Sequence, residues 1–180
     1  MIKGFGAADK LLQTPFLNII YRSVKKMLEN IFPMLETKRT NIGEQIYENF
    51  LYDMITGTIT GHAGELKGRI EIPDDIHGVE IRAIGTGAFT GCTGITELVL
   101  GHNIAEIETG AFSGCSGIKK LTLSENLKYI GNAAFMGCTA LEAVKIPKGV
   151  QHIGEQAFFA CPLKDTKIPE GIPYIAADAF

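Results

Sequence analysis

The chain has 180 residues, 46% of them hydrophobic, and a formal net charge of −3 at pH 7. This length and apolar content allow one continuous core, or a domain with an appendage, and the mild negative charge gives no signal for nucleic-acid binding. No apolar run is long enough to span a membrane, and Asp9 and Lys10 interrupt any signal-peptide core near the N-terminus.

Residues 1–50 carry a helical pattern. Thr14 and Pro15 form a good helix start, with Thr as the N-cap and Pro at the first helical position. Apolar residues then recur at spacings of three and four, as in an amphipathic helix that ends near Phe32-Pro33. These apolar residues are Phe16, Ile20, Val24, Met27 and Ile31. A second short helical stretch is predicted over Asn41–Asn49.

We interpret residues 1–50 as a helical N-terminal cap that covers the open end of the array that follows, because such arrays need their ends covered. Two alternatives remain for this segment. One is a basic amphipathic helix that binds a membrane or a partner, and the other is an unrelated fused segment. Membrane contact is expected only through this helix.

Residues 51–83 have the pattern of an entrance hairpin and a first, atypical coil. Tyr52–Ile55 and Thr58–Thr60, joined around Gly57, read as a short β-hairpin. Leu66 and the alternating pair Ile70 and Ile72 then match the strand pattern of the later coils. Terminal repeats are expected to be atypical because they cap the core.

From residue 84 to the end, one phrase returns at every twenty-third position. In its first copy the phrase runs from Ile84-Gly85 through Ala88-Phe89 to Gly91-Cys92. The phenylalanines of the copies are Phe89, Phe112, Phe135, Phe158 and, in a last incomplete copy, Phe180. A fixed period of this length indicates a stacked repeat array. We expect the phenylalanines to form a ladder through its core, because each copy can bury its apolar face only against its neighbours.

Each copy contains two extended pieces and one turn. Alternating apolar residues such as Leu98 and Leu100 predict a strand with one buried face, and a second short extended piece ends at Ile107. The Ala-Phe-x-Gly-Cys phrase is too short for an α-helix and is interpreted as a single helical or 3₁₀ turn. Strands of successive copies should pair in parallel. Pro162 stands alone where other copies have two residues, which brings Phe180 one position early and predicts an irregular last coil.

The recurring pattern Ile-Gly-x-x-Ala-Phe-x-x-Cys-x-x-Leu-x-x-Val-x-Ile-Pro resembles the BspA-type, or Treponema pallidum-type, leucine-rich repeat. The resemblance covers roughly residues 52–180, and Ile59-Thr60-Gly61 ahead of Ile70-x-Ile72-Pro73 is similar to how such arrays often begin. It implies a β-rich leucine-rich-repeat solenoid of parallel short strands with 3₁₀ or helical turns, here preceded by an α-helical N-terminal cap. It also implies binding to a protein or cell-surface ligand, a secreted or cell-surface location, and no catalytic residues. The N-terminus by itself leads us to expect a soluble protein that is either cytosolic or stripped of its leader.

Cysteine and histidine residues give no sign of a metal or cofactor site. The cysteines are Cys92, Cys115, Cys138 and Cys161. Metal ligands must converge on one point, whereas a solenoid spreads one cysteine per coil along a line. We therefore expect small buried thiols that fill a core column and point in parallel, without disulfides. The histidines have no ligand spacing and are expected in surface turns; they are His62, His77, His102 and His152.

Outward-facing columns contain the candidate partner-binding residues. One predicted face carries Lys120, Lys145 and Lys167. On another face, a single position in successive coils is occupied by Glu106, Tyr129, His152 and Tyr174. Exposed aromatic residues are favoured binding anchors; the alternative is ordinary cross-strand stacking on an exposed sheet.

The sequence therefore predicts a non-catalytic module for protein–protein or cell-surface binding, with no cofactor. The alternative is a structural or assembly module in which two copies associate through the open last coil at Phe180, since uncovered apolar columns favour end-to-end association. An enzyme would need a site in residues 1–60 that no pattern there reveals.

Overall fold

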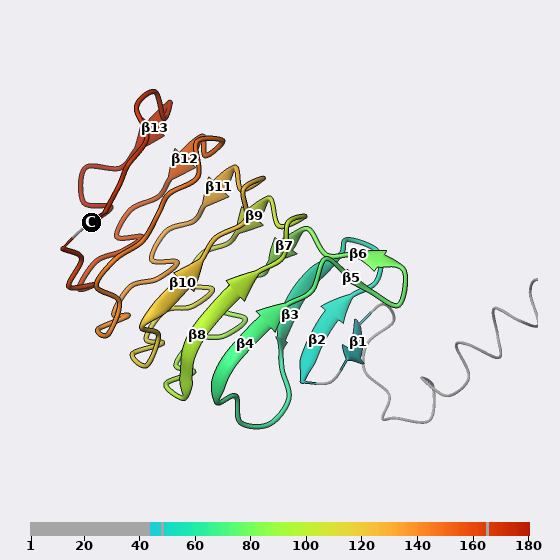
Figure 1. The fold of residues 1–180 in the computed structure, drawn as a ribbon. Coiled ribbons are helices and arrows are strands. Elements are labelled where there is room, and N and C mark those ends of the chain that lie inside the picture. The colour runs from blue at the N-terminus through green and yellow to red at the C-terminus, as the bar shows by residue number, and fades with distance from the viewer. Residues whose placement is uncertain (1–43, 48, 165) are drawn as a thin grey trace, which may run out of the picture. The chain divides into compact units, whose positions relative to one another are not determined.

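A computed structural model describes residues 44–47, 49–164 and 166–180, which belong to one compact unit (Figure 1). The helix predicted from Thr14 to Pro33 lies outside the described residues, as does the rest of the predicted cap up to residue 43. The described part of the chain is built from strands and turns and contains no helix. Accordingly, none of its elements is a helix that could cross a membrane.

The largest sheet of the described chain has eight strands. Antiparallel pairing joins its first three strands, and parallel pairing joins all the others, in the order β1-β2-β3-β7-β9-β11-β12-β13. The strands are β1 Glu44–Tyr47, β2 Phe50–Asp53, β3 Thr58–His62, β7 Ala83–Ile84, β9 Glu106–Ile107, β11 Tyr129–Ile130, β12 His152–Ile153 and β13 Tyr174–Ile175. The predicted entrance hairpin is thus confirmed as β2 and β3.

Strand β1 shows that the helical stretch predicted over Asn41–Asn49 was wrong for its central residues. They pair antiparallel with β2, from Glu44 opposite Asp53 to Tyr47 opposite Phe50. Helix propensity is a weak preference that tertiary contacts override. Here the edge of β2 supplies hydrogen-bond partners for the backbone of β1, which an isolated sequence window does not reveal.

The second sheet contains the longer strands of the early coils, β4 Gly68–Ile72, β8 Ile95–Leu100 and β10 Lys120–Thr122. They pair in parallel, in the order β10-β8-β4. The pairing of Leu121 with Leu98 confirms the predicted repeat step, because the two residues hold the same position in successive copies. In Figure 1 this ladder and the ladder from β7 to β13 occupy different sides of the stacked coils. A third, small sheet is the hairpin of β5 Asp75–Ile76 and β6 Val79–Glu80.

The last coil is irregular, as Pro162 predicts. Within the described residues the second ladder has no named strand beyond β10, and the last two coils are joined on that side by an isolated bridge between Lys145 and Lys167. Ile168 is 42% exposed, whereas its equivalent in the preceding coil, Ile146, is 2% exposed. The bridge keeps Lys167 opposite Lys145, 22 positions earlier, so the missing residue is absorbed in the turn around Pro162.

The phrase predicted as a single helical or 3₁₀ turn forms a turn with hydrogen bonds between residues three positions apart, and it is not part of a helix. In one coil, the Ser113 N–H donates to the Gly110 carbonyl at 3.0 Å. Gly110 and Gly114 have φ angles of 63° and 72°, in the left-handed region, so a right-handed helix cannot continue there. The turn also bonds to the next coil, with the Phe112 N–H donating to the Ala134 carbonyl at 2.8 Å. Backbone hydrogen bonds therefore link the coils along the turns as well as along the strands.

The phenylalanine ladder predicted from the sequence is confirmed. Its stacked rings have centroids 5.0 to 5.3 Å apart, within the range for favourable offset stacking. The rungs are Phe89, Phe112, Phe135, Phe158 and Phe180. The first four are fully buried, and Phe180 is 43% exposed. The phenylalanines therefore form one continuous column through the core, which each coil extends by one ring.

Candidate functional site

An aromatic strip, defined as Tyr129, His152 and Tyr174, lies on the largest sheet. The strands place Tyr129 opposite His152, and His152 opposite Tyr174. Ring centroids are 4.5 Å apart at both contacts, with interplanar angles of 11° and 9°. Glu106 continues the column beyond Tyr129. Because side chains alternate along a strand, the isoleucine that follows each of these residues points to the opposite face.

The strip presents ring edges and hydroxyl groups, with one face of each tyrosine and both faces of His152 covered by stacking. Tyr129 is 36% exposed and Tyr174 is 48% exposed. The two tyrosines cover both faces of the His152 ring, and each gives up one of its own faces in doing so. Aromatic edges carry the positive part of the ring quadrupole, and the phenol hydroxyl both donates and accepts hydrogen bonds. This surface therefore suits a partner that offers carbonyl or carboxylate acceptors.

The three candidate lysines lie on the second ladder, so the seven predicted residues form two groups rather than one site. Lys120 is paired with Glu97 on the neighbouring strand, with its Nζ 4.0 Å from the carboxylate. Lys145 and Lys167 share a column two strand positions away from that of Lys120. The Nζ of Lys145 lies 3.2 Å from the Glu125 carboxylate.

Lys145 and Lys167 also line a cavity of about 360 Å³, to which Lys148 and Glu125 contribute. Its apolar lining is Ile146, Ile168 and Pro169. Three lysines and one glutamate are among its lining residues, so the lining is cationic although the chain as a whole has a net charge of −3. This cationic cavity can accept a carboxylate that is attached to an apolar group.

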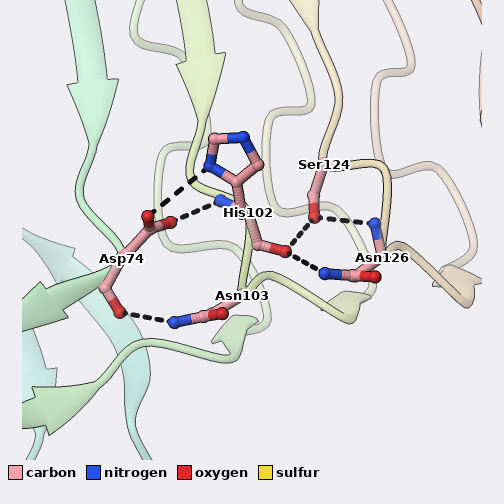
Figure 2. A network of polar contacts seen from close by, with 5 residues as sticks. All are labelled: Asp74, His102, Asn103, Ser124 and Asn126. Carbon is pink, nitrogen blue, oxygen red and sulfur yellow. Dashed lines mark hydrogen bonds and ion pairs between the residues drawn. The ribbon is translucent and has the colours of Figure 1, made fainter.

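A polar network ties together the turns that follow β4, β8 and β10 (Figure 2). The Asp74 carboxylate accepts the His102 backbone N–H, and its other oxygen lies 3.5 Å from the His102 Nδ1. The Asn103 side chain donates to the Asp74 carbonyl at 3.3 Å. One coil further, the buried Ser124 hydroxyl and the Asn126 amide both donate to the His102 carbonyl, at 2.7 and 3.0 Å. These hydrogen bonds satisfy polar groups of the turns that do not pair with a neighbouring strand, so the network has a structural role.

All four thiols are free cysteines. The Sγ of Cys115 donates to the Phe89 carbonyl at 3.0 Å, and the Sγ of Cys138 bonds to the Phe112 carbonyl at 3.4 Å in the same way. Burial raises the pKa of the Cys115 thiol to about 12, so it stays protonated at neutral pH. Within the described residues, no three His, Cys, Asp or Glu side chains converge on a possible metal position.

His62 is the residue that sequence reasoning missed. It was expected in a surface turn, but it ends strand β3 and its ring stacks on Phe89, with centroids 5.9 Å apart and an interplanar angle of 7°. It is therefore the first ring of the phenylalanine ladder. His62 precedes Phe89 by more than one repeat step, so the period of the phrase does not point to it.

Comparison with known proteins gives a family match and a set of similar structures. A family model described as "BspA type Leucine rich repeat region" matches residues 68–180 in six copies. The chain is similar to a leucine-rich repeat protein of T. pallidum, with 27% identity and a TM-score of 0.70 over 76% of this chain and 65% of that one. No protein in the comparison with curated sequences matches this chain.

Two further solved structures are similar. A leucine-rich repeat protein of Bacteroides ovatus has 27% identity and a TM-score of 0.62, over 81% of this chain and 38% of that one. A leucine rich cell surface protein of Faecalibacterium prausnitzii, with 24% identity and a TM-score of 0.70, shows likeness of fold over 77% of this chain and 37% of that one. The chain thus spans less than two thirds of the length of each of these three proteins.

Proposed function

Because the chain belongs to the BspA-type leucine-rich repeat family, whose solenoids are generally non-catalytic, we propose that it is a module for protein–protein or cell-surface binding. The aromatic strip is its contact surface. A repeat stack supplies an extended surface on a rigid scaffold, and the same family membership supports a secreted or cell-surface location.

The single observation that carries this proposal is the in-register stacking of the exposed strip. Tyrosine contributes a large amphipathic contact area with few rotatable bonds, so little conformational entropy is lost on binding. Stacking fixes the rings further, with centroids 4.5 Å apart on each side of His152. The strip is therefore organised before a partner arrives, which favours its use as a binding surface.

The geometry favours a protein ligand over a carbohydrate. Sugars pack on the open faces of aromatic rings, but both faces of His152 and one face of each tyrosine are already covered. Ring edges and hydroxyl groups instead match the carbonyl and carboxylate acceptors of a polypeptide. The cationic cavity on the second ladder offers acidic side chains a further contact with Lys148 and Lys167.

Peptides selected from a random library on the immobilised protein test this proposal. Replacing both Tyr129 and Tyr174 with alanine is expected to raise the Kd of the selected peptides by about 30-fold, because each aromatic anchor contributes roughly 1 kcal/mol or more to the binding free energy. Isothermal titration calorimetry measures the loss. The circular dichroism spectrum should stay unchanged, since both side chains are partly exposed.

Phe159→Ala is the matched control, because Phe159 is 51% exposed but lies in a turn outside the strip. It should leave peptide affinity unchanged. Equal binding by the double tyrosine variant would show that the strip is not the site. Binding to a glycan array that disappears in the same variant would instead assign the strip to carbohydrates.

A second candidate function, self-association, is favoured by exposed apolar side chains in the last coil. Ile168, Ile175 and Phe180 are 42%, 39% and 43% exposed. If two copies associate through this coil, the mass from light scattering should rise with protein concentration, and Ile175→Asp should abolish the rise. Tyr129→Ala serves as the control and should leave the rise intact. A constant monomer mass at every concentration would exclude this candidate.

A further inference from the structure

Cys92 differs from the equivalent cysteines in its hydrogen-bond partner. The Sγ of Cys115 donates to a backbone carbonyl, that of Phe89, 26 positions earlier. The Sγ of Cys92 lies 3.1 Å from the Nε2 of His62 instead. The coil before Cys92 contains the entrance hairpin in place of an Ala-Phe-x-Gly-Cys phrase, so a histidine occupies the place next to this thiol.

The tautomer of the neutral His62 ring follows from its second contact. Its Nδ1 lies 3.0 Å from the Gly64 carbonyl oxygen, which can only accept a hydrogen bond. Nδ1 therefore carries the proton, and Nε2 presents its lone pair to the Cys92 thiol. Stacking on Phe89, with an interplanar angle of 7°, fixes the ring in this orientation. The pair is arranged so that the imidazole can accept the thiol proton.

The pair opens onto a cavity of about 290 Å³. His62 and Cys92 line it together with Glu65, Thr90 and Thr93. Its volume lies at the lower end of the range for small-molecule pockets. Cys92 is 8% exposed and lines this cavity, so the proposed reagent is a small molecule that enters the cavity.

We propose that Cys92 and His62 form a thiol–imidazole site that exchanges with low-molecular-weight disulfides. The thiol proton passes from Sγ to Nε2 while the sulfur attacks one sulfur atom of the disulfide. The S–S bond breaks, and the departing sulfur leaves with the bonding electron pair and takes the proton back from Nε2. The products are a mixed disulfide at Cys92 and one small thiol. One disulfide bond is lost and one is formed, so no further oxidant is required.

The other cysteines show why the imidazole matters. Burial raises the pKa of the Cys92 thiol, so the thiolate is scarce at neutral pH and the reaction depends on a base beside the sulfur. Burial also raises the pKa of the Cys115 thiol, to about 12, but its partner is a carbonyl oxygen that cannot take up the proton. The two thiols occupy equivalent repeat positions and interact with each other, but only Cys92 has an imidazole nitrogen beside it.

The test is the rate at which the full chain reacts with 2-hydroxyethyl disulfide at neutral pH. After an acid quench, cleavage after Glu97 separates the peptide of Cys92 from that of Cys115, and mass spectrometry measures each mixed disulfide. Cys92 is expected to react before Cys115, which is also buried. His62→Phe extends the phenylalanine ladder by one ring but removes Nε2, and should slow the reaction at Cys92 by about 100-fold.

His62→Gln provides a second removal of the base if the larger ring disturbs folding. Equal rates at Cys92 and Cys115 in the unaltered protein would overturn the proposal, because they would show that general opening of the fold controls access. An unchanged rate at Cys92 in a folded His62→Phe or His62→Gln variant would also overturn it.

Discussion

Replacing Phe112 with alanine is expected to lower the free energy of unfolding by about 4 kcal/mol, the usual cost of removing a fully buried phenylalanine. The Phe112 ring lies between Phe89 and Phe135, with centroids at 5.0 and 5.3 Å, so the substitution leaves a cavity and removes two ring contacts. Urea unfolding followed by circular dichroism measures the loss.

The effect should reach the neighbouring coils, because the stability of a repeat stack is the sum of terms within coils and between them. Hydrogen exchange should therefore show lost protection at the amides of Phe89 and Phe135. Phe159→Ala is the control, since its side chain is 51% exposed and its loss should change stability by less than about 0.5 kcal/mol. Equal losses of stability in the Phe112 and Phe159 variants would mean that the phenylalanine ladder is not the main interaction that holds the coils together.

Replacing Gly57 with alanine is expected to lower the free energy of unfolding by about 3 kcal/mol, through overpacking added to backbone strain. Gly57 has a φ of +68°, and a Cβ built there would stand 2.1 Å from the Glu80 carbonyl oxygen. The Gly57 carbonyl also accepts the Arg82 N–H at 2.9 Å, which joins the β2–β3 turn to the segment before β7. The added methyl group must push these two segments apart.

Gly78→Ala separates the two causes. Gly78 has a φ of +82°, but a Cβ there would meet no atom within 4 Å. It should therefore cost only the backbone strain, about 1 kcal/mol. Thermal unfolding of the two variants under the same conditions gives the difference between their losses of stability. This difference is the cost of the close approach to Glu80 alone. Equal losses would show that the turn can move away from Glu80 at no cost.

The aromatic strip was predictable because it follows from the period. Residues one repeat step apart fall in one column of a solenoid, so Tyr129, His152 and Tyr174 had to share a face. The same arithmetic predicts the phenylalanine ladder and its Cys column. The sequence does not state how exposed each column is, because exposure depends on the curvature and spacing of the coils.

Features outside the period were missed for two reasons. Glu44–Tyr47 has no strong strand pattern and becomes a strand only because β2 presents an edge to it. His62 and Cys92 are 30 residues apart, so only the entrance hairpin brings the two side chains together.

By itself, the sequence determined the solenoid, its repeat step and which columns face the core, since a repeat leaves each coil only its neighbours to pack against. The tertiary structure alone decided how exposed the strip is, and the pairing of Cys92 with His62. These depend on how the first coil departs from the repeat and how the two ladders are arranged around each coil. Segments that depart from the repeat period come into contact only when the chain folds. The spacing of residues in the sequence therefore does not predict those contacts.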